Sequence, residues 1–243
     1  MRIATLATSF CALALVATAL APAQAPAQVP SCCVLPDNGS GTVSMPPNCP
    51  EGYEGSPMVI IDGLPPGTTM QSPARLGSFF NTSEVPGGTL GGTLAQYSGT
   101  LDLDLQGTGT LLGFHRVVAI PMQGEMHTAP RAPGNPVQSF DTDMFFMQGQ
   151  ITGDPDFDLL RITGGTGFGM PSPGHTTLTR QPTTDWAVDS FFDITYRIDF
   201  VGHPGSPLGG MSGSTTGTIR MTTCQSPVPV QASTWGTIKR LYQ

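Results

Sequence analysis

The sequence predicts an all-β protein: an antiparallel sandwich or barrel, tied by disulfides and followed by a short C-terminal helical tail. Short runs of β-forming residues recur between Gly and Pro turns along most of the chain, which is typical of antiparallel sheets. No ten-residue helical pattern free of Gly and Pro occurs before residue 230. Of the 243 residues, 38% are hydrophobic and the net charge is only −7, so the composition favours a folded chain over a disordered one.

The strongest strand signal covers residues 188–201. Apolar and polar side chains alternate along it, which predicts a strand with one buried face. That face carries Phe192, Ile194, Tyr196, Ile198 and Phe200. Shorter strands are predicted at 58–61, 101–105, 113–120, 140–151, 158–163 and 214–222.

The first 23 residues have the pattern of a secretory signal peptide. Arg2 precedes an apolar run over 3–21, and a small-residue site at Ala21-Pro22-Ala23 follows, with cleavage expected after Ala23 and Ala27 as the second choice. The alternative is a retained membrane anchor, because the run is just long enough to span a bilayer. We expect a secreted protein (extracellular, periplasmic or cell surface) with no transmembrane segment after cleavage. After the signal peptide we expect an irregular Cys-containing leader at 24–57, an all-β domain at 58–224 and a Pro-hinged tail at 225–243.

Four cysteines remain after cleavage: Cys32, Cys33, Cys49 and Cys224. In an oxidising compartment this number suggests two disulfides. Neighbouring cysteines seldom reach disulfide geometry, so we expect one of the vicinal pair to bind Cys49 and the other to bind Cys224. A four-thiolate zinc site is the alternative, but Cys224 stands alone and such sites need two close ligand pairs.

The charge distribution argues against a nucleic-acid partner. Loss of Arg2 changes the net charge from −7 to −8, and Lys239 is the only lysine. The chain therefore lacks the basic stripe that phosphate-backbone binding requires.

Motifs for catalysis or metal binding are sparse. The candidate metal ligands are Asp154, Asp156 and Asp158, whose spacing resembles the start of a calcium loop. Leu159 and Gly165 stand where an EF-hand needs glycine and glutamate, so we expect a Pro-containing turn and no cofactor. A non-EF calcium site that uses Asp154, Asp156 and backbone carbonyls is the alternative.

Other chemical patterns are incomplete. Glu125 and His127 share one strand face and could supply two metal ligands, although surface polarity explains them as well. The stretch from Gly210 to Ser214 starts like a nucleophile elbow but lacks its final glycine, and the glycine-rich run at 164–167 lacks the lysine of a phosphate loop. The remaining histidines are His115, His175 and His203.

The tail differs from the body of the chain. After Pro227 and Pro229, a short amphipathic turn would present Trp235, Ile238 and Leu241 on one side. A helix this short is unstable alone in water, so we expect it to dock on a partner at the cell surface or in the export machinery, or to pack on the β domain as a lid.

Residues 58–222 resemble a set of uncharacterised secreted β-rich proteins of environmental bacteria. The resemblance lies in four stretches: 138–144 (QSFDTDM), 153–158 (GDPDFD), 171–177 (PSPGHTT) and 189–196 (DSFFDITY). The final residues 235–242 (WGTIKRLY) are similar to terminal tails of other exported bacterial proteins. The resemblance implies no known activity, so no functional residue follows from it.

These observations favour a secreted, non-catalytic β domain with a structural, adhesive or surface-associated role. The alternative is a carbohydrate- or ligand-binding module, which would need exposed aromatic side chains on one sheet face. An extracellular hydrolase is the third hypothesis, because Asp- and His-bearing loops could converge in space.

Overall fold

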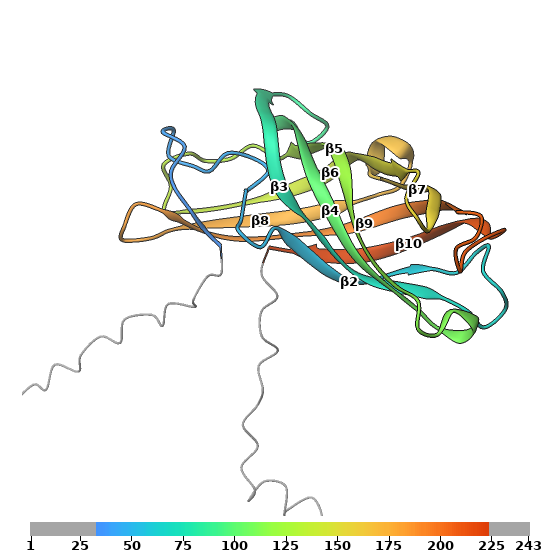
Figure 1. Cartoon of the computed structure of the whole chain (residues 1–243). Coiled ribbons are helices and arrows are strands. Elements are labelled where there is room, and N and C mark those ends of the chain that lie inside the picture. The colour runs from blue at the N-terminus through green and yellow to red at the C-terminus, as the bar shows by residue number, and fades with distance from the viewer. Residues whose placement is uncertain (1–32, 224–243) are drawn as a thin grey trace, which may run out of the picture. The chain divides into compact units, whose positions relative to one another are not determined.

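The computed structural model describes residues 33–223, which form an all-β antiparallel structure (Figure 1). The predicted signal segment, Cys32, Cys224 and the tail residues Trp235, Ile238 and Leu241 lie outside the described residues. Among residues 33–223, no helix is long and apolar enough to cross a bilayer. The strands are β1 (Val34–Leu35), β2 (Tyr53–Ile60), β3 (Met70–Pro86), β4 (Thr93–Gly107), β5 (His115–Thr128), β6 (Val137–Thr152), β7 (Phe157–Gly164), β8 (Pro173–Arg180), β9 (Trp186–Gly202) and β10 (Ser212–Thr222); η1 (Gly109–Leu111) and η2 (Thr166–Phe168) are single 3-10 turns.

The ten described strands form one sheet that curves into a nearly closed ring. From β10 the order runs through β2, β3, β4, β5, β6 and β7, and β9 pairs with both β10 and β7. The short strands β7 and β8 both bridge β6 and β9: β8 pairs with the first half of each of these long strands and β7 with the second half. In Figure 1, β3, β4 and β5 cross in front of β8, β9 and β10.

Strand β9 confirms the strongest sequence prediction. It covers Trp186–Gly202, and the predicted face of Phe192, Ile194, Tyr196, Ile198 and Phe200 is at most 2% exposed. The same face continues to Val188 and Trp186, which are also buried. The closed path from β9 through β10 and β2 to β7 contains eight strands. In a ring of this size, side chains are expected to fill the interior, as these large residues do.

The sequence prediction missed three strands. Strand β3 loses its period of two because the register shifts between Gly77 and Ser83, where Ser78 and Asn81 have positive φ. Such bulges add residues to one strand and break the alternation on which the prediction depends. Strand β8 has one large apolar residue, Leu178, and β1 is only two residues long.

The boundary predicted between leader and β domain, at residue 58, differs from where the first long strand begins, at Tyr53. It falls inside β2, and residues 33–50 pack on the ring as a strap. Cys33 and Cys49 form a disulfide, and both are buried together with Val43 and Met45. The composition of this segment suggested an irregular peptide, but its few apolar residues are enough to dock it on the core.

We expect Phe200→Ala to lower the free energy of unfolding by about 3–5 kcal/mol, because it leaves a cavity in a packed core. Val201→Ala is the matched control: Val201 is the next residue of β9 and is 40% exposed. Its cost should be about 0.5 kcal/mol or less. Chemical denaturation of both variants measures this difference, and equal losses would show that the two faces of β9 are not distinguished by burial.

We also expect the mature protein to contain no free thiol. With Cys33 bound to Cys49, the sequence argument assigns Cys32 to Cys224, a pairing that lies outside the described residues. Cys33 and Thr223, the described residues next to Cys32 and Cys224, both bond to β9. Val188 N–H donates to Cys33 O, and Thr223 N–H donates to Ser190 O. Thiol titration of denatured, unreduced protein checks this expectation, and two free sulfhydryls would contradict it.

Candidate ligand-binding groove

The four histidines do not meet in one cleft. Each instead pairs with a carboxylate close by: His115 with Asp104 at 2.5 Å, His127 with Glu125 at 2.9 Å, His175 with Asp141 at 2.9 Å, and His203 with Asp158 at 2.7 Å. Three of these pairs join neighbouring strands or the loops that end them, and the fourth lies within β5. A multi-histidine catalytic centre or metal site is therefore not formed by these side chains.

The predicted calcium ligands are held by basic side chains. Asp154 Oδ2 lies 2.5 Å from Arg116 Nη2, and Asp156 Oδ2 lies 3.5 Å from Arg116 Nε. Asp158 points to His203 instead. Asp154 also accepts the N–H of Asp156, so the segment forms the Pro-containing turn that the sequence favoured. Within residues 33–223, no group of three or more His, Cys, Asp or Glu residues is arranged to hold a metal ion.

Burial alone would raise the pKa of Asp154, but the hydrogen bond from Arg116 and the N–H of Asp156 outweigh it and lower the pKa below 3.8. A carboxylate with a lowered pKa stabilises the fold above its ordinary pKa, and this contribution disappears as the pH falls through the lower folded value.

We therefore expect Asp154→Asn to reduce the free energy of unfolding at pH 7, and the difference from wild type to shrink as the pH falls below about 4. Urea denaturation across this pH range measures the effect. Asp62→Asn, at an exposed turn position, is the control and should leave stability nearly unchanged at pH 7. A pH-independent loss in Asp154→Asn would show that the carboxylate charge is not the stabilising feature.

The Glu125–His127 pair belongs to a fixed polar array. Thr89 N–H donates to His127 Nδ1 at 3.2 Å, so Nδ1 carries no hydrogen and Nε2–H donates to Glu125. The imidazole stacks on Phe145, with ring centroids 4.4 Å apart, and Gly88 packs against the ring, where a Cβ would lie 3.0 Å from it. His127 is thus buried by the β3–β4 turn, although its sequence position suggested the wet face of a strand.

Glu125 borders a groove of about 410 Å³ that crosses β3, β4, β5 and β6. Its polar lining consists of amides, hydroxyls and one carboxylate: Asn81, Gln96, Gln123, Ser83, Ser98 and Glu125. Gln96 donates to Glu125 Oε2 at 2.9 Å, so both carboxylate oxygens are engaged. The position of the Glu125 carboxylate is therefore fixed from two sides.

One wall of the groove is aromatic. Phe146 lines it, and Phe168 of η2 packs on Phe146 with centroids 5.0 Å apart. Gly165 starts this turn at φ 110°, and a Cβ there would lie 2.5 Å from Phe145 O, so the glycine-rich run at 164–167 serves close packing. Trp186 is not part of this wall, because it is fully buried and donates its indole N–H to Asp37.

Two further grooves are less suited to a polar ligand. One, of about 250 Å³, lies over β2, β3 and β4 beside the Arg75–Asp102 ion pair and is mainly apolar. The other, of about 420 Å³, contains Arg116 and Asp154, which already form an ion pair with each other.

Sequence inspection singled out Glu125 but missed the other residues of the groove. Asn81 and Ser83 lie in the bulged part of β3, which was not predicted as a strand. Gln96 of β4 lies opposite Glu125 of β5, and Gln123 of β5 lies opposite Ser98 of β4, so only the pairing register reveals that these side chains converge. Comparison with protein-family models, curated proteins and solved structures gave no match.

Proposed function

We propose that the protein is an exported surface-associated β domain that binds a neutral, hydroxyl-rich ligand, an oligosaccharide, in the groove bounded by Gln96, Gln123 and Phe146. The observation that carries this proposal is the combination of side-chain amides, hydroxyls and a fixed carboxylate beside an aromatic wall. It joins the adhesive role and the carbohydrate-binding alternative that the sequence favours into one hypothesis.

The chemistry of the lining matches that of a sugar. An amide offers both donor and acceptor atoms, and a hydroxyl offers the same, so each can pair with ligand hydroxyls in either sense. Phe146 supplies an apolar face for the C–H surface of a sugar ring. The groove volume lies in the range of small-molecule sites, roughly 300–1,000 Å³.

The groove is also stiff. Its floor is the β4–β5 pair, which is in continuous register from Thr93 to Gln106. Glu125 is held by His127 and Gln96, and a preformed site loses less entropy on binding than a flexible one. This arrangement suits recognition by fixed hydrogen bonds.

We expect the mature protein to bind one or more classes of oligosaccharide on a glycan array, with affinity then measured by calorimetry. Gln123→Ala should weaken that binding about two- to tenfold, the effect of losing one hydrogen bond of roughly 0.5–1.5 kcal/mol. Gln150→Ala is the matched control, since Gln150 is an exposed glutamine of β6 outside the groove lining.

Two outcomes would contradict the proposal. One is the absence of binding to every glycan of the array by folded protein. The other is binding that Gln96→Ala and Gln123→Ala leave unchanged, which would place the ligand elsewhere on the surface.

A further inference from the structure

A second polar array, on β6 and β8, has the connectivity of a catalytic triad. Ser139 and Asp141 lie two residues apart on β6, and His175 of β8 is the register partner of Asp141. Ser139 Oγ lies 2.8 Å from His175 Nε2, and Asp141 Oδ1 lies 2.9 Å from His175 Nδ1.

The order of these contacts determines the protonation of the imidazole. Because Asp141 can only accept when ionised, Nδ1 carries the hydrogen and donates it to the carboxylate. Nε2 is then unprotonated and can accept the hydrogen of Ser139. This is the arrangement in which a histidine acts as general base toward a serine, with the carboxylate fixing the tautomer.

Accessibility separates this array from the one around His127. Ser139 and Asp141 are exposed, and the His175 side chain is 37% exposed. Thr89 Oγ1 also lies 2.9 Å from His127 Nδ1, but that ring is buried and accepts a backbone N–H at the same atom. A substrate in solution can therefore approach Ser139, whereas the imidazole next to Thr89 is already used by the main chain.

We infer that Ser139, His175 and Asp141 form a nucleophilic site that hydrolyses activated carboxylic esters. Ser139 Oγ attacks the ester carbonyl and its proton passes to His175 Nε2, while Asp141 stabilises the imidazolium. The bond to the leaving alcohol breaks and Nε2 returns the proton to that alcohol. Water then attacks the acyl-serine with Nε2 as base, the acid is released, and Ser139 regains its proton, so that ester and water give acid and alcohol.

The surroundings set the expected rate and substrate class. Thr177 Oγ1 lies 3.3 Å from Ser139 Oγ and offers one hydrogen-bond donor beside the reacting carbon. Efficient acyl transferases use donors aimed at the oxyanion, each contributing roughly 10²–10³ in rate. With a single hydroxyl in this role, we expect slow turnover limited to esters with good leaving groups, such as aryl acetates.

The test uses the mature, full-length protein with p-nitrophenyl acetate and, separately, a fluorophosphonate probe followed by peptide mass spectrometry. We expect the probe on Ser139 and ester hydrolysis above the buffer rate. Ser139→Ala should lose both signals. Asp141→Asn should slow labelling by about tenfold or more, because the imidazole tautomer is no longer fixed.

The control is Ser212→Ala, at an exposed serine of β10, which should leave labelling and hydrolysis unchanged. Circular dichroism and melting temperature verify that each variant is folded. The inference is overturned if the folded wild-type protein takes no label on Ser139, or if His175→Gln is labelled there as fast as wild type. Hydrolysis that survives in Ser139→Ala would likewise place the activity elsewhere.

Discussion

The pairing of both edges of β9 is the constraint on which the rest of the structure depends. Along one edge, β9 pairs with β1 at its start and with β10 over the rest of its length. Along the other edge, it pairs with β8 in its first half and with β7 in its second half. A sheet with free edges exposes unpaired backbone groups, whereas closure satisfies them within the chain. Because β9 is long and its inner face is apolar apart from Ser190, a change there would disturb ring closure and core packing together.

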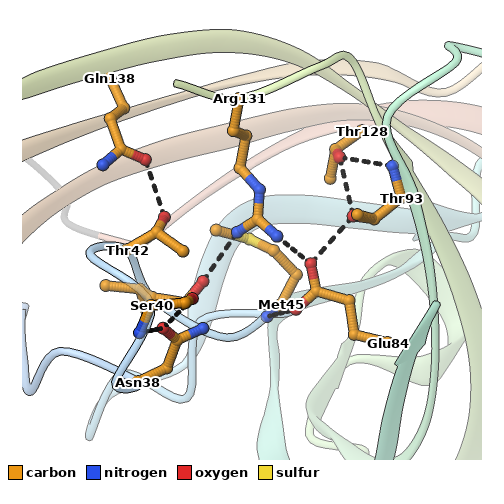
Figure 2. Close-up of polar contacts among 10 residues, drawn as sticks. Asn38, Ser40, Thr42, Met45, Glu84, Thr93, Thr128, Arg131 and Gln138 are labelled. Atoms are coloured by element: carbon orange, nitrogen blue, oxygen red, sulfur yellow. Dashed lines mark hydrogen bonds and ion pairs between the residues drawn. The ribbon is translucent and has the colours of Figure 1, made fainter. Parts of the chain in front are cut away.

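Polar contacts add to the few buried apolar residues and the disulfide that hold the strap over residues 33–50. Figure 2 shows Arg131 between the strap and β3: it donates to Val43 O at 2.8 Å and forms an ion pair with Glu84. Glu84 also accepts from Met45 N–H and from the Thr93 hydroxyl. The Arg131 side chain is 9% exposed, so its charge is compensated within this cluster.

A second anchor joins the strap to the core. The carboxylate of Asp37 accepts the indole N–H of Trp186 at 3.0 Å and the N–H groups of Gly39 and Gly41. The hydrogen bond from Trp186 lowers the pKa of Asp37. Farther along the strap, Thr42 donates to the amide of Gln138 on β6, as Figure 2 shows. The strap therefore contacts β3, β6 and β9, strands that do not pair directly with one another, and links them at one place.

The sequence predicted the fold class and the core face of β9 because alternation and turn residues are local signals. The sequence-based prediction failed where the structure depends on contacts between residues that lie far apart in the sequence. Thr176 of β8 is buried because it bonds to Ser190 of β9, a contact that no local pattern indicates. Residues 33–50 lack periodicity, and their contacts with Arg131 and Trp186 join residues that lie far apart in the sequence. The groove and the Ser139 array depend on the register of β3, β4, β5, β6 and β8, so composition alone could not reveal them.

The same geometry explains why the chemically capable groups of this protein lie on its outer face. Inside the ring, most side chains are large and apolar, such as Trp186 and Phe157, and the buried hydroxyls of Ser190 and Thr176 bond to each other. On the outside, alternate residues of neighbouring strands stand close enough for side chains to bond across the pair. Such pairing produces hydrogen-bonded arrays readily, and burial then determines their role. His127, covered by the β3–β4 turn, positions Glu125 at the groove, whereas His175, left open on β8, keeps a basic nitrogen within reach of Ser139 and of a substrate.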